Sequence, residues 1–207
     1  MVIGVAMMAA MVPTVYGLNE ASKGAQNSES KRRETTRKTR CHLTAQCDFD
    51  TGTLNQRQEV HNARIYLDSD NQMYITKNPT PSMSPFNGFF YQSPDFEHGN
   101  LSGLVTVSGE EPPQLRWVFL DPETHDLRWG GREEREGGIS GPFDLTEDEE
   151  YITLNGTQRW MAVRSKHAGA STGLWQLHFD WNETEGGSLP DSAEKLLIFL
   201  KRAPSDS

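Results

Sequence analysis

Short alternating segments constrain the fold of this chain more than any other feature. In residues 174–181, the apolar side chains of Trp175, Leu177, Phe179 and Trp181 alternate with polar ones. A period of two puts one kind of side chain on each face, which is typical of a strand with one buried face. Similar runs, separated by Gly, Pro, Asn and Asp, occur at residues 62–68, 72–77, 87–92, 101–107, 114–120, 125–130 and 195–202. We therefore expect an all-β domain, an antiparallel β-sandwich or barrel of about nine or ten short strands.

Two segments with similar sequences predict similar hairpins. YLDSDNQMYI (residues 66–75) and FLDPETHDLRW (residues 119–129) both run into Leu-Asp, pass through a polar turn and return to apolar or aromatic residues. The first begins like a calcium loop, but Met73 stands where that loop needs glycine and Pro79 where it needs a bidentate glutamate. We therefore interpret both as β-turn hairpins, as an internal duplication would produce. A third hairpin is expected at Asn155-Gly156, because both residues accept the positive φ of a tight turn.

The amino-terminal region divides into two segments ahead of the strand-rich part. Residues 1–17 carry an apolar run about half as long as a membrane-spanning helix, followed by small residues, which is typical of a secretory signal peptide. Residues 18–40 are polar and basic, so we expect a disordered segment that processing at Lys31-Arg32-Arg33 would remove as a propeptide. The alternatives are an uncleaved apolar terminus and a basic patch for nuclear localisation or nucleic acid. Residues 41–207 form the expected β-sandwich domain.

The charge of the expected domain argues against nucleic acid as its partner. The chain has 20 Lys and Arg and 29 Asp and Glu, and residues 41–207 hold 13 of these bases and 26 of these acids. The resulting net charge of −13 repels a polyanion. No segment has the length and position of a membrane anchor. We therefore expect no nucleic-acid partner and no integral membrane association.

Cysteine spacing and glycosylation motifs both fit an extracellular location. Cys41 and Cys47 are separated by five residues, and in an oxidising compartment this spacing predicts a small local disulfide. Two free buried thiols are the alternative. Asn-X-Ser/Thr motifs predict N-glycosylation at Asn100, Asn155 and Asn182, all in expected loops. We therefore expect a secreted glycoprotein that is extracellular or attached to the cell wall.

One continuous segment carries a resemblance to known proteins. VFLDPETHDLRWGGREEREGGISGPFDLTEDEEYITLNGTQRWMAV (residues 118–163) resembles uncharacterised small secreted proteins of filamentous fungi, in which a D-P-E-T turn, a G-P-aromatic element and an acidic step precede a Trp-containing strand. The repeated layout of strand, Asp-rich turn and return strand is also loosely similar to the fungal phialide cell-wall protein family. These resemblances imply a secreted or wall-associated fungal protein with a role in conidium formation or host contact, and they imply no catalytic residue.

Catalytic patterns are weak in this sequence. The six histidines lack the spacing of zinc ligands, and Ser140 has Pro142 where a nucleophile elbow needs glycine two residues after the serine. Acidic runs at residues 133–136 and 147–150 are typical of solvated loops, although two carboxylates held across a sugar would support hydrolysis. A weak calcium site at residues 147–150 is a further alternative. We expect no metal site and no cofactor, and we favour a non-enzymatic protein over an enzyme.

A ligand-binding site is expected around Trp129. In the segment RWGGR, Arg128 and Arg132 flank an indole whose face the two glycines would leave uncovered, so a sugar ring has both an aromatic plate and polar groups at its rim. A core position for Trp129 is the alternative, and core positions are expected for Trp175 and Trp181. We therefore interpret the chain as a secreted, glycosylated, non-enzymatic binding protein of the cell wall or extracellular space, directed toward polysaccharide. A glycan-active hydrolase and an effector that binds a host protein are the alternatives.

Overall fold

The chain separates into two compact units, residues Met1–Arg37 and Lys38–Ser207. The computed structural model describes residues 26–92, 102–107, 112–164, 173–182, 189–190 and 192–205. Asn100 of the first predicted glycosylation motif lies outside these described residues. In the described part of the chain, no helix is long and apolar enough to cross a membrane.

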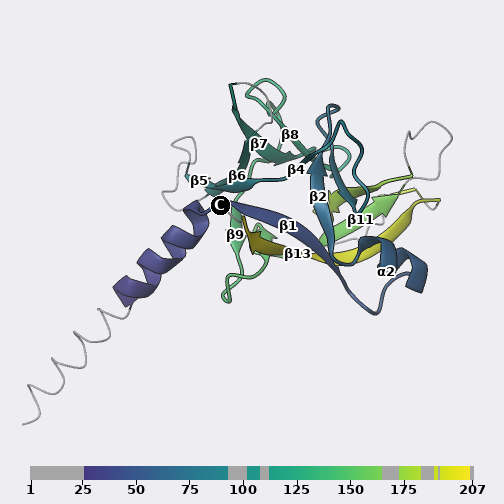
Figure 1. The fold of residues 1–207 in the computed structure, drawn as a ribbon, viewed down its shortest axis with the longest axis horizontal. Coiled ribbons are helices and arrows are strands. Elements are labelled where there is room, and N and C mark those ends of the chain that lie inside the picture. The colour runs from purple at the N-terminus through teal and green to yellow at the C-terminus, as the bar shows by residue number, and fades with distance from the viewer. Residues whose placement is uncertain are drawn as a thin grey trace, which may run out of the picture. The chain divides into compact units, whose positions relative to one another are not determined.

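The second unit is built almost entirely of strands (Figure 1). In chain order its elements are β1 (Cys41–Cys47), α2 (Leu54–Val60), β2 (Ala63–Leu67), β3 (Met73–Thr76), β4 (Ser84–Pro85), β5 (Gly88–Gln92), β6 (Ser102–Val107), β7 (Leu115–Leu120), β8 (Leu127–Gly130), β9 (Phe143–Leu145), β10 (Ile152–Leu154), β11 (Trp160–Arg164), β12 (Trp175–Phe179) and β13 (Glu194–Pro204). The all-β prediction is confirmed, with 13 strands in the described residues against the nine or ten expected.

Six strands close into a barrel. β1 pairs with β13, β13 with β11, β11 with β12, β12 with β3, β3 with β2, and β2 returns to β1, each pair antiparallel. Figure 1 shows β1 and β13 running side by side, and their ladder extends from Cys41↔Pro204 to Cys47↔Ile198. Closure leaves these strands no free edge, which an open sandwich would have. The sequence predicted either a sandwich or a barrel, and these six strands form a barrel.

The remaining strands are joined to this barrel through β1 and β2. β4 pairs with β2, while β5, β6, β7 and β8 form successive antiparallel pairs that join the barrel where Cys41 of β1 meets Gly88 of β5. A Cβ atom at Gly88 would lie 2.2 Å from the carbonyl oxygen of Val105, so only glycine permits this close approach. β9 pairs with β6 and with β10.

Strand β1 overturns the predicted disulfide. Cys41, Leu43, Ala45 and Cys47 are all buried and alternate with partly exposed residues, so the two cysteines stand at opposite ends of one strand. At about 3.3 Å per residue they are roughly 20 Å apart, whereas a disulfide needs Cα atoms within about 7 Å. Both thiols are free and buried, and burial raises the pKa of Cys41 to about 11. The disulfide prediction is wrong because the segment between the two cysteines is an extended strand with a period of two and not a loop that could bring them together.

Two helices differ from the all-strand expectation. α2 begins with a capping box, in which Thr53 accepts from the backbone of Gln56 while the Gln56 side chain accepts from the Thr53 backbone. Residues 26–38 are also helical, although no apolar period predicts structure there. Pairs of opposite charge four residues apart, Glu29 with Arg33 and Glu34 with Lys38, favour a helix locally without a buried face.

The two hairpins with similar sequences form as predicted and contact each other. The β2–β3 turn has a positive φ at Asn71, and the β7–β8 turn has one at His125. Asp121 organises the second turn by accepting from the backbone N–H groups of Glu123 and Thr124. The Trp129 backbone N–H donates to the Asn71 carbonyl at 3.1 Å, so the end of β8 is fixed to the β2–β3 turn.

The Asn155-Gly156 turn forms, but the hairpin expected around it does not continue. Both residues have positive φ, 51° and 72°, and Leu154 and Thr157 exchange backbone hydrogen bonds across the turn. Beyond this bridge, β10 pairs with β9, whereas β11 pairs with β12 and β13. The turn chemistry was therefore predicted correctly and the strand partners were not.

Candidate ligand-binding site

A pocket of about 600 Å³ lies beside α2, where β3 ends and β12 begins. Its lining consists of Asn55, Gln58, Glu59, Ile75, Thr76, Lys77, Asn78, Gly173, Leu174 and Trp175. We call it the α2 pocket. Its volume falls in the range of about 300–1,000 Å³ that small-molecule sites occupy.

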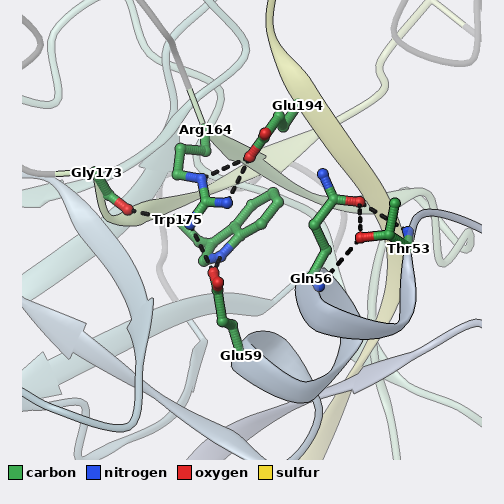
Figure 2. Close-up of polar contacts among 7 residues, drawn as sticks. All are labelled: Thr53, Gln56, Glu59, Arg164, Gly173, Trp175 and Glu194. Atoms are coloured by element: carbon green, nitrogen blue, oxygen red, sulfur yellow. Dashed lines mark hydrogen bonds and ion pairs between the residues drawn. The ribbon is translucent and has the colours of Figure 1, made fainter.

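The fold fixes α2 at the edge of this pocket. The Thr53–Gln56 capping box begins the helix, and the buried side chain of Val60 anchors its last turn to the core. Glu59, one residue earlier, therefore projects from the helix toward Trp175 and Arg164, as Figure 2 shows. The Glu59 side chain is 48% exposed, so it remains accessible at the rim.

Arg164 joins two carboxylates from distant parts of the chain. Its guanidinium lies between Glu59 of α2, at 2.6 Å, and Glu194 of β13, at 2.5 Å (Figure 2). The Trp175 indole N–H donates to the same Glu59 carboxylate oxygen at 2.8 Å, and the guanidinium stacks over the Trp175 ring at 4.3 Å. Four side chains from α2, β11, β12 and β13 thus hold one another in place.

The electrostatics of this cluster favour fixed charges over proton transfer. Burial alone lowers the pKa of Arg164, but hydrogen bonds and attraction from Glu194 and Glu59 outweigh burial, so the net pKa is raised above its ordinary value. The guanidinium therefore stays charged at every physiological pH. The cluster is suited to orient Glu59 as a hydrogen-bond acceptor.

Three amides at the rim are available for a ligand. The side-chain amides of Asn55, Gln58 and Asn78 are exposed and make no hydrogen bond within the described residues. Lys77, the cation of the pocket, donates from Nζ to the Gln58 carbonyl oxygen at 2.6 Å. With one Glu and one Lys, the charged side chains of the lining balance.

The structure places the predicted Trp129 site elsewhere. The Trp129 side chain is partly buried against the core, and its Nε1–H donates to the Asp68 carbonyl at 3.1 Å. Arg128 pairs with Asp121 at 3.3 Å, and Arg132 is exposed in the following turn. None of these three residues lines the α2 pocket.

The two glycines after Trp129 do not leave open space. A Cβ atom at Gly130 would meet the Glu134 side chain at 2.7 Å, and one at Gly131 would meet Arg116 at 2.7 Å. The room that they leave is therefore filled by neighbouring side chains of β7 and the 131–136 turn. Whether Trp129, Arg128 and Arg132 bind a ligand stays a prediction.

Sequence reasoning missed a partly exposed aromatic pair on the outer strands. Tyr91 of β5 is 41% exposed and packs edge-on against Trp117 of β7, with ring centroids 5.7 Å apart. Arg135 stacks over the same indole at 4.5 Å. Neither β5 (GFFYQ) nor β7 (LRWVFL) alternates in polarity, so the sequence carried no signal that would have singled out these two rings.

The other predicted sites lie on the surface. Asn155 and Asn182 are exposed in turns, as a glycan acceptor must be. Asp148, in the acidic 147–150 run, accepts from the Thr146 hydroxyl and the Glu150 backbone, which lowers its pKa. Among the described residues, no group of three or more His, Cys, Asp or Glu is arranged to hold a metal ion.

The fold and the pocket define the class of protein as an all-β barrel domain with a polar pocket beside a short helix. The chain belongs to the fungal β-trefoil domain family, whose sequence profile matches residues 17–204. A search among curated proteins found no match, and neither did a search among solved structures. Family membership confirms the expected fungal all-β protein, while similarity to the phialide family stays a prediction.

Proposed function

We propose that this domain is a non-enzymatic carbohydrate-binding protein, secreted and glycosylated, that acts at the fungal cell wall or in the extracellular space. Its α2 pocket binds the saccharide. β-Trefoil domains often bind carbohydrate, which supports the general class. The side chains that line the α2 pocket support a saccharide as the ligand.

The single observation that carries the proposal is the set of hydrogen-bonding groups around the α2 pocket. Asn55, Gln58 and Asn78 offer amide donors and acceptors, and Glu59 offers an acceptor that Arg164 and Trp175 hold in position. Sugar hydroxyls both donate and accept, so they match a mixed lining better than a purely anionic or cationic ligand does. The balanced charge of the lining favours a neutral saccharide.

The carboxylates of the site do not suit glycoside hydrolysis. Such hydrolysis needs one carboxyl that is protonated and a second that is ionised, held on either side of the scissile bond. Glu59 and Glu194 instead both contact one guanidinium, so the two carboxylates are directed at the same cation and not at a bond held between them. Binding without turnover is therefore the better use of this geometry.

Secretion rests on separate observations. The apolar run in residues 1–17 is followed by small residues, and the acceptor side chains of Asn155 and Asn182 are exposed. Expression through a fungal secretory host tests this part of the proposal. We expect a product in the medium that lacks residues 1–17 and carries glycan at Asn155, read by mass spectrometry; an intact, unmodified chain inside the cell contradicts it.

Retention on insoluble chitin, β-glucan and cellulose tests saccharide binding by the full chain. We expect retention on at least one polymer and a loss of about tenfold or more in a Gln58→Ala/Asn78→Ala variant, since each lost pair of hydrogen bonds costs about 1–2 kcal/mol. Both positions are exposed, so folding is preserved. Absence of retention on all three polymers contradicts the proposal, and release of soluble sugar contradicts its non-enzymatic part.

Matched variants locate the site. Trp129→Ala and Arg132→Ala test the β8 region that the sequence predicts, and Trp117→Ala tests the Tyr91–Trp117 pair. We expect all three variants to be retained on the polymer as strongly as the parent chain. Loss of retention in one of them, with Gln58→Ala/Asn78→Ala unaffected, would move the site to that residue.

A further inference from the structure

A second pocket, of about 500 Å³, lies at the opposite end of the β11–β12 hairpin from the α2 pocket. It forms where β11 begins and β12 ends, near the middle of β13, because Trp160 of β11 pairs with Phe179 of β12 on one side and with Ile198 of β13 on the other. Along β12, Trp175 and Asp180 are five residues or about 17 Å apart. The two pockets are therefore separate, and no residue lines both of them. We call this one the β13 pocket.

One side of the β13 pocket is apolar. Leu197 and Phe199 point outward from β13, since the alternating residues Leu196, Ile198 and Leu200 are buried inside the barrel. Phe199 is among the exposed large apolar side chains and packs edge-on against Tyr151, with ring centroids 6.0 Å apart. This side offers a ligand a hydrocarbon or aromatic contact surface.

The other side is rich in acceptors. The lining includes the carboxylates of Asp48 and Asp180, and Asp180 is only 5% exposed. Gln158 Oε1 is buried and has no hydrogen-bond partner among the described residues. Arg159 is the cation of the lining, so the charged side chains leave a net charge of −1. A buried acceptor without a partner is uncommon and calls for a donor.

We propose that the β13 pocket binds a small organic ammonium ion that carries an apolar group. The ammonium donates to Gln158 Oε1 and faces the acidic side, while the apolar group packs on Leu197 and Phe199. Each half of the lining thus selects one half of the ligand, and the α2 pocket, with its balanced charge and amide rim, offers no equivalent arrangement. The site is independent of saccharide binding.

A charge series of one scaffold tests this proposal on the full chain. Titration with phenethylammonium chloride, 2-phenylethanol and sodium phenylacetate, followed by amide NMR shifts, compares a cation, a neutral molecule and an anion of similar size. We expect the cation to bind at least tenfold more tightly than the alcohol and the anion not to bind. Shifts should centre on Gln158, Asp180 and Phe199. Equal affinity for all three probes, or shifts centred elsewhere, overturns the proposal.

Substitutions at Gln158 separate recognition from folding. Gln158→Leu removes the acceptor and should weaken phenethylammonium binding at least fivefold, whereas Gln158→Glu adds negative charge and should strengthen it. Matching far-ultraviolet spectra for both variants establish that the fold is kept; if Gln158→Leu does not fold, Phe199→Ala replaces it, with the same loss expected. Unchanged affinity in the folded variants overturns the proposal.

A second substitution makes the two proposed sites distinguishable. Gln58→Ala, in the α2 pocket, should weaken saccharide retention and leave phenethylammonium binding unchanged. A loss of ammonium binding in Gln58→Ala contradicts the assignment to the β13 pocket. Retained ammonium binding supports the assignment, whatever the saccharide result.

Discussion

Trp160 and Trp175 lie at opposite ends of the same β11–β12 hairpin and are both buried, at 0% and 3% exposure. Their surroundings differ in kind. Trp160 stacks with Phe143 at 6.5 Å and meets Phe179 edge-on at 4.7 Å, and its Nε1–H donates to the Ile152 carbonyl oxygen at 2.8 Å. The indole N–H and both of these ring contacts of Trp160 therefore involve neutral groups.

Trp175 has charged partners instead. Its Nε1–H donates to the Glu59 carboxylate, and the Arg164 guanidinium covers its ring (Figure 2). The indole is thus part of the core on one side and of the α2 pocket on the other. Two tryptophans with similarly low exposure can therefore have different roles. The partner of the indole N–H makes the difference, because Trp160 bonds a backbone carbonyl of the core whereas Trp175 positions the Glu59 carboxylate.

The largest expected loss of stability comes from a substitution at Trp160. Trp160→Ala should lower the free energy of unfolding by about 3–5 kcal/mol, because it removes the largest fully buried side chain among the described residues and leaves a cavity between Phe143 and Phe179. Urea denaturation followed by far-ultraviolet circular dichroism measures the change. Trp160→Phe, which keeps an aromatic ring, should lose less than the alanine variant. A loss below about 1 kcal/mol in Trp160→Ala would show that this end of the hairpin does not depend on the indole.

An intermediate loss of stability is expected from a substitution in the charged cluster around Trp175. Arg164→Met keeps the length of the side chain and removes the cation that Glu59 and Glu194 share. We expect a loss of about 1–3 kcal/mol in the free energy of unfolding, below the loss from Trp160→Ala because the cluster is partly solvated. Arg132→Met, at an exposed position in a turn, is the control. If Arg164→Met lowers the free energy of unfolding as much as Trp160→Ala does, the two ends of the hairpin contribute equally to stability.

A smaller effect sharpens the comparison at a single atom. Trp175→Phe keeps a buried ring and deletes the N–H that orients Glu59. We expect a loss of about 1 kcal/mol in stability and a severalfold weaker retention of saccharide, since Glu59 is then held by Arg164 alone. Trp160→Phe is the matched variant for retention, which should not change. Unaltered retention in Trp175→Phe would separate this indole from the site.

Local patterns in the sequence predicted most strands but few of their partners. β12 illustrates both outcomes. Trp175, Leu177 and Phe179 face the core as their alternation predicts, but His178 and Asp180, on the face predicted to be polar and outward, are buried as well. The reason is tertiary, because the β7–β8 turn covers this face: the Phe179 backbone donates to the His125 carbonyl, and His178 faces Asp126 at 3.3 Å.

The α2 pocket depends on contacts between residues that are still farther apart in the sequence. Glu59 meets Arg164 across 105 positions of sequence and Trp175 across 116. Neither alternation nor capping indicates which strand pair will receive the end of a helix, so the α2 pocket could not be derived from local patterns. The capping box at Thr53 and Gln56, by contrast, is visible in the sequence, and it would have placed α2 correctly. Cys41–Cys47 likewise shows the period of a strand when it is examined as one.

The smallest expected effect concerns the β7–β8 turn, which packs against β12 next to Trp160. Burial alone raises the pKa of Asp121, but hydrogen bonds from Thr124 and Glu123 and the charge of Arg128 outweigh it, so the net pKa is lowered. A carboxyl whose pKa is lower in the folded state contributes stability that is fully present above its unfolded value, about 4, and is lost as the pH falls through the folded value. Asp121→Asn should therefore cost less than about 1 kcal/mol at pH 7 and show a flatter decline in the free energy of unfolding between pH 5 and pH 3 than the parent chain. Parallel declines in both proteins would mean that the turn is held by its backbone alone, and that the acid sensitivity of this end of the hairpin has another source.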